Sequence, residues 1–251
     1  GTTGRSKGVM LSHTNLVSNS LNTIIGLTIP NNARWVHAAP MFHIADVTGA
    51  IAITHIAGQH YFIPGFSPDA VLNSIQDYAI TDTLLVPTMI NMLVNHPDVK
   101  KYDLSSLRQI TYGASPMPES VIIKAMEVIP KCDFAHAYGM TETAPLLTIA
   151  PPDCHVFEGP KANLFKSTGL AVTGVEIKIV DDNDNELPRG EVGEVAAKGA
   201  NVMLGYWRQK ELSDKALRNG WMHTGDGGYM NDEGYVYIVD RVKDMIISGG
   251  E

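Results

Sequence analysis

The stretch SPDAVLNSIQDYAITDTLLVP, residues 67–87, holds the signals for one helix and one strand in immediate succession. Ser67 can accept a hydrogen bond from the free backbone N–H groups at a helix start, and Pro68 suits the first helical position. The apolar residues that follow share one helical face: Val71, Leu72, Ile75 and Tyr78. The short apolar run 83–86 is predicted as a strand that Pro87 ends. Helix and strand in this order are typical of layered α/β folds.

The same alternation continues on both sides of residues 67–87. Polar side chains at residues 12–15 offer caps for the first of the further predicted helices. These helices cover residues 16–25, 44–56, 88–94 and 118–128, and the further predicted strands cover residues 35–38, 60–63 and 107–112. Such regular alternation predicts a layered α/β subdomain with a partly parallel sheet, and we assign residues 1–159 to it.

The pattern changes at about residue 160. Hydrophobic and polar residues now alternate with a period of two in three runs, residues 175–180, 193–197 and 236–239. Turn sequences such as residues 182–185 separate these runs, and short alternating runs between turns predict strands. We therefore expect a small β-rich, barrel-like subdomain over residues 160–240, after the α/β subdomain.

The composition of the 251-residue chain excludes some classes of function. Its formal net charge of −8 does not favour nucleic acid, because that binding depends on clustered lysine and arginine. No stretch approaches the ~20 apolar residues that cross a bilayer. Cys132 and Cys154 are far apart and are interpreted as reduced thiols, which suits a cytoplasmic protein. The chain begins with Gly1 rather than Met and ends at Glu251 in a glycine-rich run, so we interpret it as a fragment. The composition leaves open whether it forms an oligomer.

The first candidate motif is the N-terminal run GTTGRSKG, residues 1–8. Its glycines let a backbone approach an anion closely, and its hydroxyl groups and Lys7 supply donors and positive charge for phosphate oxygens. The run is not a Walker A loop, because Gly8 rather than Ser or Thr follows Lys7. Taken alone, it is equally compatible with a phosphate loop and with a solvated turn.

The second motif is YGMTE, residues 138–142. Tyr138 can stack on a base, and the carboxylate of Glu142 can hold Mg²⁺ beside substrate phosphates. The alternative is a strand that ends in a helix capped by Thr141.

Two further runs, Thr224-Gly225-Asp226 and Asp240-Arg241, combine acidic and basic groups. A carboxylate can accept hydrogen bonds from both hydroxyls of a ribose, and an arginine can neutralise a phosphate with two hydrogen bonds. An aspartate that follows a glycine is also common in turns, so neither run is decisive alone.

These motifs occur in the order and approximate spacing of adenylate-forming enzymes, and residues 112–118 and 193–207 are also similar to that family. The chain therefore resembles, over its whole length, a central part of the large N-terminal domain of the adenylate-forming (ANL) superfamily. That superfamily includes acyl- and aryl-CoA synthetases, luciferases and the adenylation domains of peptide synthetases. The resemblance implies the fold of an acyl-CoA synthetase and the activity of a fatty-acid–CoA ligase.

The resemblance implies a nucleotide site drawn from much of the chain. Its members are Thr2, Thr3, Gly4, Lys7, Ala114, Ser115, His136, Ala137, Tyr138, Thr141, Asp226 and Arg241. Thr2, Thr3 and Lys7 would lie on a loop over the β- and γ-phosphates of ATP. The Thr-Ser-Gly that usually precedes this loop in the family is absent from the chain.

At the nucleoside end, the resemblance implies that Tyr138 stacks on the adenine and that His136 reaches its exocyclic amine. Ala114 and Ser115 would line the same pocket, where the family more often has Gly-Ala. Asp226 would accept the ribose hydroxyls.

At the phosphate end, the catalytic residues that the resemblance implies are Thr141, Glu142 and Lys7. Thr141 would form a hydrogen bond with the α-phosphate, and Glu142 would be the metal ligand for Mg²⁺. Arg241 would support the ribose and the phosphates.

For the acid, the resemblance assigns His43 to the aromatic gate beside the acyl pocket. The alternative is a structural histidine at a helix start. Gly113, Gly139 and Met140 would form part of the pocket wall. This wall carries no charged group that could bind the ammonium of an amino acid, so we predict an apolar fatty or aryl acid.

The implied reaction joins a small-molecule carboxylic acid to ATP as acyl-AMP, releases pyrophosphate and then transfers the acyl group to coenzyme A. Lys243 would lie at the hinge of a small C-terminal domain, which residues 241–251 would begin. Because the rest of that domain is not in this chain, we expect the fragment alone to be inactive. Two alternatives remain: an adenylation domain that loads a carrier protein, and a nucleotide-binding module without turnover.

Overall fold

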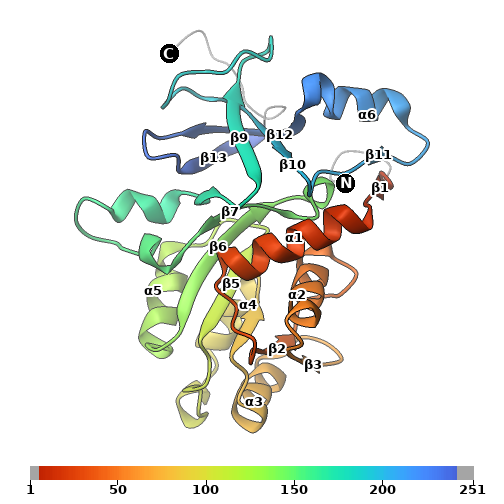
Figure 1. Cartoon of the computed structure of the whole chain (residues 1–251). Helices are drawn as coiled ribbons and strands as arrows, with labels where there is room; N and C mark the ends of the chain where they lie inside the picture. Colours follow the sequence, from red (N-terminus) through yellow and green to blue (C-terminus); the bar gives the residue numbers. More distant parts are fainter. Residues whose placement is uncertain (1–5, 242–251) are drawn as a thin grey trace.

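The computed structural model describes residues 6–241, in which one large mixed sheet is surrounded by helices (Figure 1). The order of the strands in this sheet is β3-β2-β4-β5-β6-β7-β8. These strands are β2 (Arg34–His37), β3 (Gln59–Phe62), β4 (Asp82–Leu84), β5 (Gln109–Gly113), β6 (Asp133–Gly139), β7 (Leu146–Ala150) and β8 (Leu170–Ala171). The accompanying helices are α1 (His13–Gly26), α2 (Ile44–His55), α3 (Pro68–Tyr78), α4 (Pro87–Val94) and α5 (Glu119–Val128). The predicted alternation of helices and strands is thereby confirmed.

Two smaller sheets complete the described part of the chain. A curled antiparallel sheet has the order β13-β12-β10-β9, and a short sheet pairs β1 with β11. Their strands are β1 (Val9–Met10), β9 (Val175–Val180), β10 (Gly193–Gly199), β11 (Gly205–Tyr206), β12 (Met222–Met230) and β13 (Val236–Arg241). The remaining helical segments are α6 (Lys210–Ala216), η1 (Val99–Lys101), η2 (Thr141–Thr143), η3 (Pro152–Cys154), η4 (Ala162–Lys166) and η5 (Arg218–Gly220).

Local side chains explain where α1 and α3 begin. The Ser12 hydroxyl accepts a hydrogen bond from the Asn15 backbone N–H at 3.2 Å, and the Asn15 side chain accepts one from the Ser12 N–H at 2.7 Å. This reciprocal capping box satisfies two backbone donors at the start of α1. Ser67 caps α3 by accepting a hydrogen bond from the Ala70 N–H at 3.1 Å, and Pro68 is the first helical residue, as the sequence predicts.

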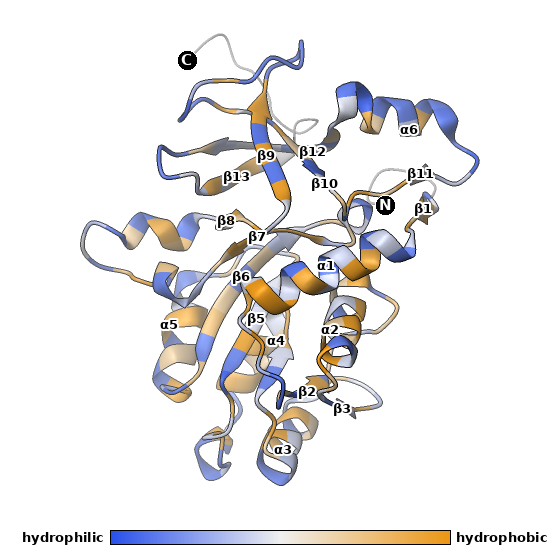
Figure 2. Ribbon diagram, in the orientation of Figure 1, coloured by the Kyte–Doolittle hydropathy of each residue, from blue (hydrophilic) through white to orange (hydrophobic). Residues whose placement is uncertain are grey.

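Alternate residues of the strands pack into two different cores. Trp35 of β2 belongs to a buried cluster with Ile53 of α2, on the face of the sheet that α1 and α2 cover (Figure 1). Its neighbour Val36 belongs to a second cluster, with Leu72 of α3 and Ile90 of α4, on the opposite face. In Figure 2, α6 is largely hydrophilic, and none of its residues is buried. Every described helix falls short of the length and apolarity that a membrane-spanning segment needs.

Strands β3, β2, β4, β5 and β6 are parallel neighbours, so their carboxyl ends lie along one edge of the sheet. In open α/β sheets ligands bind outside this edge. Gly113 ends β5 and Gly139 ends β6, so the motifs at residues 112–118 and 138–142 meet there. Strand β7 then runs antiparallel to β6, and β8 pairs with β7, so the large sheet continues past residue 160.

The curled sheet packs against the large sheet through residues such as Ala197 and Val175, which share a buried cluster with Leu147. Its strand β12 is not among the strands that the alternation predicts, because the segment MHTGDGGYM is rich in glycine and lacks a period of two. Asp226 therefore lies inside a nine-residue strand and not in a connecting turn.

Candidate active site

Residues 6–8 of the first motif and the second motif meet through the segment around β11. Strand β11 pairs with β1, which begins two residues after Lys7. The Met203 N–H donates to the backbone oxygen of Glu142 at 2.8 Å, and the Trp207 N–H donates to that of Gly8 at 2.7 Å. These bonds bring Lys7 and Glu142 to one point, although they are far apart in the sequence.

Lys7, Glu142 and Tyr206 form a hydrogen-bonded set at this point. The Tyr206 hydroxyl donates to Glu142 Oε1 at 2.8 Å and accepts from Lys7 Nζ at 3.1 Å. Lys7 Nζ also lies 3.9 Å from Glu142 Oε1 and 4.4 Å from the centre of the Tyr206 ring. Burial and the neighbouring carboxylate raise the pKa of Tyr206 above its ordinary value, so the phenol keeps its proton and remains a donor.

Sequence reasoning gives Tyr206 no role. The only signal is its position in Gly205-Tyr206-Trp207, within a segment that resembles the family. Its partners follow only from the pairing of β11 with β1.

The surroundings of Glu142 suit Mg²⁺. Its side chain is mostly buried, and its second oxygen, Oε2, accepts no hydrogen bond from residues 6–241. Within those residues no three His, Cys, Asp or Glu side chains gather as a metal cage. Mg²⁺ is commonly held by one or two carboxylates together with substrate phosphates and water, so a single carboxylate fits this ion.

Thr141 begins the 3-10 turn η2 next to Glu142, and its side chain is exposed. Its hydroxyl makes no hydrogen bond within the described part of the chain, so the alternative role as a helix cap is not found. Instead Thr143 stabilises the turn, because its hydroxyl donates to the Met140 backbone oxygen at 3.0 Å. The Thr141 hydroxyl therefore remains available to a ligand.

A second contact joins the two main sheets. The Tyr138 hydroxyl of β6 donates to Asp226 Oδ2 of β12 at 2.7 Å. Arg241 lies opposite Asp226 in the ladder between β12 and β13, so its backbone is beside the same point. The structure thus brings together the three residues that the sequence assigns to adenine, ribose and phosphate. The side chain of Arg241, like residues Thr2, Thr3, Gly4 and Lys243, lies outside what the structure describes.

His136 lies two residues before Tyr138 on β6. Its Nδ1–H donates to the Ser167 backbone oxygen at 3.2 Å, and its ring stacks on Tyr112 with the ring centres 5.0 Å apart. Burial lowers the pKa of His136 to about 4, so the ring is neutral at pH 7. With the proton on Nδ1, Nε2 is the acceptor of this ring.

The neighbours of His136 form an aromatic layer beneath it. The hydroxyl of Tyr112 donates to His155 Nε2 at 2.8 Å, and both side chains are buried. Burial lowers the pKa of His155, which keeps that ring neutral as well.

Ala114 and Ser115 follow β5 at the carboxyl edge and are exposed. Ala114 has a φ of 67°, a left-handed conformation that is strained for alanine. Ala137 of β6 lies opposite Gly113 of β5 in the parallel ladder. These residues therefore lie at the same edge as Tyr138.

Gly139 has a structural reason to be glycine. A Cβ atom there would lie 1.9 Å from the backbone oxygen of Pro145, far inside contact distance. This close approach accompanies the register shift between β6 and β7. The glycine assigned to the acyl pocket is thus also required by the backbone path.

His43 is the residue just before α2 and is exposed beside Phe42, whose side chain is 85% exposed. A cavity of about 420 Å³ lies next to them, between the loops that follow β2 and β3. Its larger apolar lining residues are Met41, Phe42, Phe62, Ile63, Phe66 and Met89. His43 is not part of its lining, and neither are the predicted pocket residues Gly113, Gly139 and Met140.

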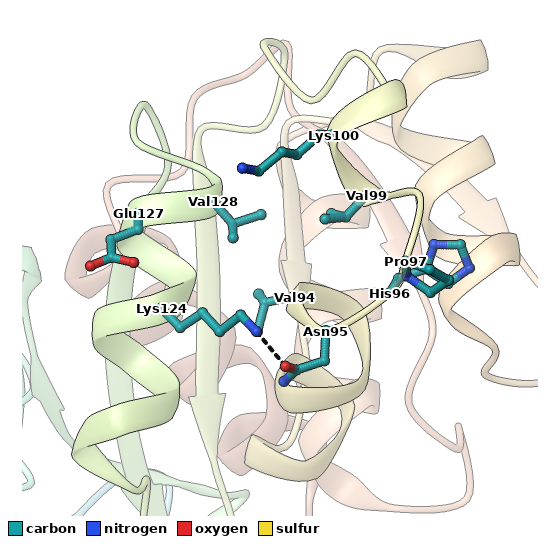
Figure 3. A pocket seen from close by; sticks show the side chains of 9 residues that line it. All are labelled: Val94, Asn95, His96, Pro97, Val99, Lys100, Lys124, Glu127 and Val128. Carbon is teal, nitrogen blue, oxygen red and sulfur yellow. Dashed lines mark hydrogen bonds between the residues drawn. The ribbon is translucent and has the colours of Figure 1, made fainter.

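Another cavity, of about 360 Å³, lies between the ends of α4 and α5 (Figure 3). Lys124 donates to the Asn95 side chain there, and Lys100 and Glu127 also line it. Helix C-termini in this topology lie at the edge of the sheet opposite the carboxyl ends of the strands. None of the predicted site residues lines this cavity, so it is separate from the candidate active site.

The chain is similar in sequence and in structure to known proteins. The feruloyl-CoA synthase of an Amycolatopsis species is 36% identical over 252 residues, which cover 100% of this chain and 50% of that protein. The long-chain-fatty-acid–CoA ligase of Escherichia coli O6:H1 is 37% identical over 256 residues, 100% of this chain and 44% of the ligase. The structure of Bacillus subtilis O-succinylbenzoate coenzyme A synthetase (MenE) with ATP and magnesium superimposes with a TM-score of 0.89 at 31% identity, over 100% of this chain and 50% of MenE.

A partly parallel sheet with a curled antiparallel sheet beside it is the architecture of the N-terminal domains of adenylate-forming enzymes. The family model described as AMP-binding enzyme matches residues 1–207, and the chain belongs to that family. The chain spans about half the length of the curated relatives it matches.

Proposed function

We propose that the protein containing this chain is an ATP-dependent acid–CoA ligase, which activates a carboxylic acid as acyl-AMP and then transfers the acyl group to coenzyme A. The observation that carries the proposal is the convergence of Lys7, Tyr206 and Glu142 beside the exposed hydroxyl of Thr141. A cation, a carboxylate and a free hydroxyl at one point suit the phosphates of ATP and their metal ion.

In the proposed first step, an oxygen of the substrate carboxylate attacks the α-phosphorus of ATP, and pyrophosphate leaves. Negative charge on the phosphates is met by the ammonium of Lys7, and the Thr141 hydroxyl donates to an α-phosphate oxygen. Glu142 would hold Mg²⁺, which when bound neutralises phosphate charge. In the second step the thiol of coenzyme A attacks the acyl carbon, and AMP leaves with the bonding electrons.

The adenosine is proposed to lie at the carboxyl ends of β5 and β6. Tyr138 stacks on the base, and Asp226 accepts the ribose hydroxyls with support from Arg241. The neutral ring of His136 suits a role beside the adenine, because its Nε2 can accept a hydrogen bond from the exocyclic amine. Ala114, Ser115 and Ala137 would complete this pocket, as Thr2, Thr3 and Gly4 would complete the phosphate loop.

An apolar acid is the proposed substrate. The lining of the 420 Å³ cavity beside His43 and Phe42 is largely apolar, which suits a fatty or aryl chain. Gly113, Gly139 and Met140 would form the wall nearest the reacting carboxylate. Lys243 would be the hinge for the domain movement between the two steps.

The test is exchange of pyrophosphate into ATP by the full-length protein, supplied with a panel of fatty and aryl acids. Glu142→Gln keeps the shape of the side chain but removes its charge, so exchange should fall at least about 100-fold. Glu127→Gln, at an exposed glutamate of the remote cavity, is the matched control and should leave exchange unchanged. Exchange by Glu142→Gln within threefold of the wild-type rate would overturn the proposed site.

A further inference from the structure

Four ionisable side chains gather on the curled sheet close to Asp226. They come from the turn after β9, from β10, from η5 and from β12, and they are Asp184, Glu194, Arg218 and His223. Their side chains are 14%, 17%, 31% and 3% exposed, respectively. Sequence analysis assigns none of them a function, and none is part of the site proposed above.

Glu194 is the centre of this cluster. Its Oε2 accepts from Arg218 Nη2 at 3.1 Å and from His223 Nδ1 at 2.9 Å. Arg218 Nε also donates to both oxygens of Asp184, each at 3.0 Å, and His223 Nε2 lies 3.7 Å from Asp184 Oδ1. The hydrogen bonds from Arg218 hold the pKa of Asp184 below its ordinary value, so Asp184 stays charged and keeps Arg218 in place.

The other oxygen of Glu194 has a different partner. Oε1 accepts from the backbone N–H of Gly225 at 2.9 Å, and Gly225 immediately precedes Asp226. The ladder between β10 and β12 is interrupted at this place, because Glu194 pairs with Gly227 whereas Ala196 pairs with His223. The segment from Thr224 to Asp226 therefore bulges out of the ladder.

Side chains contribute hydrogen bonds to this bulge. The Thr224 hydroxyl donates to the Val195 backbone oxygen at 2.8 Å and accepts from the Asp226 N–H at 3.1 Å. The Gly225 N–H donates to the Glu194 side chain. The orientation of Glu194 thus sets the backbone position from which Asp226 reaches Tyr138.

We propose that Glu194, fixed by Arg218 and His223, is a positioning residue that holds the bulge presenting Asp226 to the ribose of the nucleotide. The inference deepens the proposed function and rests on the ribose role of Asp226. Glu194 touches no substrate in this scheme, and it acts through the Gly225 amide. The position of the Glu194 carboxylate therefore affects how strongly the protein prefers a ribose over a sugar that lacks the 2′ and 3′ hydroxyls.

The test compares equilibrium binding of ATP and of 2′,3′-dideoxy-ATP to the full-length protein. Asp226→Ala should reduce the preference for ATP by roughly 10- to 100-fold, the range expected for charge-assisted hydrogen bonds. Glu194→Met keeps the length of the side chain but cannot accept from Gly225, and it should reduce the same preference by about 3- to 10-fold. Glu194→Gln keeps one acceptor oxygen for Gly225 but turns an NH2 donor toward Arg218 and His223, so it should lose less of the preference than Glu194→Met.

The pair of Glu194 variants separates positioning from simple stability. Both variants lose the negative charge that Arg218 and His223 contact. If Glu194 had only a structural role, the two variants would therefore behave alike, and each would bind ATP and 2′,3′-dideoxy-ATP more weakly by the same factor. Glu176→Met, at an exposed carboxylate of β9, is the control and should change nothing. If Glu194→Met does not fold, Glu194→Asp, which is one methylene too short to keep all its partners, takes its place.

Each outcome decides the inference. A larger loss of preference in Glu194→Met than in Glu194→Gln supports it. An unchanged preference in Glu194→Met, while Asp226→Ala loses it, overturns the role of Glu194 and leaves the proposed function intact. If Asp226→Ala keeps the full preference, the ribose assignment fails, and the positioning role fails with it.

Discussion

The hydroxyl of Tyr206 offers the sharpest test of how the phosphate end is built. Tyr206→Phe removes one oxygen atom and keeps the ring that packs in a buried cluster with Met203 and Met222. That oxygen donates to Glu142 at 2.8 Å and accepts from Lys7 at 3.1 Å. A hydrogen bond to a charged group contributes about 1.5–3 kcal/mol, which corresponds to roughly a 10- to 150-fold change in an equilibrium or rate constant.

We expect kcat/KM for ATP in pyrophosphate exchange to fall by this factor in the full-length Tyr206→Phe variant. We also expect a higher Mg²⁺ concentration for half-maximal exchange, because Glu142 is less well oriented. Tyr61→Phe removes a hydroxyl that donates to the Gln59 side chain at 2.9 Å on the exposed strand β3, and it serves as the matched control. Exchange and Mg²⁺ dependence within threefold of wild type for Tyr206→Phe would refute the reasoning.

Three further predictions concern His136, Gly139 and the pair of His37 and Asp46. The pKa of His136 is about 4 in the folded state and about 6.5 in the unfolded state, so the unfolded state binds more protons between these values and stability falls as the pH drops through this window. Between pH 7 and pH 5 the free energy of unfolding, measured in urea, should therefore fall by about 2 kcal/mol less in His136→Gln than in wild type. An equal fall in both proteins would contradict this. Gly139→Ala should destabilise by about 1–3 kcal/mol because its Cβ would meet a backbone oxygen, whereas Gly65→Ala, with open space around it, should be neutral in thermal unfolding. Asp46→Ala should cost about 3 kcal/mol in the same measurement, because it leaves buried His37 without the carboxylate 2.9 Å from its Nδ1, and a cost below 1 kcal/mol would exclude this pair as a determinant of stability.

Helices α1 and α3 could be predicted from the sequence because their signals are local. The caps Ser12 and Ser67 act within three residues of their own position, so a pattern search finds them. Strand β12 could not be predicted, because glycine and aspartate are poor strand formers. It exists because β10 and β13 pair with it on both sides, which is a property of the tertiary structure.

In the candidate site, too, some features have a local signal in the sequence and others depend on the tertiary structure. Tyr138 and Asp226 each had a local alternative, and only the order of several motifs along the chain favoured a shared site. The structure joins them across 88 residues by a hydrogen bond. Tyr206 and Glu194 could not be identified in advance, because Tyr206 meets partners 64 and 199 residues away and Glu194 acts on a backbone amide 31 residues away. A sequence pattern carries no information on such contacts until the strand pairing is known.

The two charged groups at the phosphate end are held unequally, and this difference bears on mechanism. Glu142 is fixed twice, by the Tyr206 hydroxyl on its side chain and by the Met203 N–H on its backbone oxygen. Lys7 is 40% exposed, and its ion pair with Glu142 is 3.9 Å long. An exposed pair of this kind contributes at most about 1 kcal/mol. A phosphate that draws the ammonium away gives up this pair and the 3.1 Å hydrogen bond to the Tyr206 hydroxyl, at a side chain that water already reaches. Displacing the mostly buried carboxylate would break its 2.8 Å hydrogen bond from Tyr206. The carboxylate is thus the fixed reference of the site, and the lysine is the group that adapts to the nucleotide.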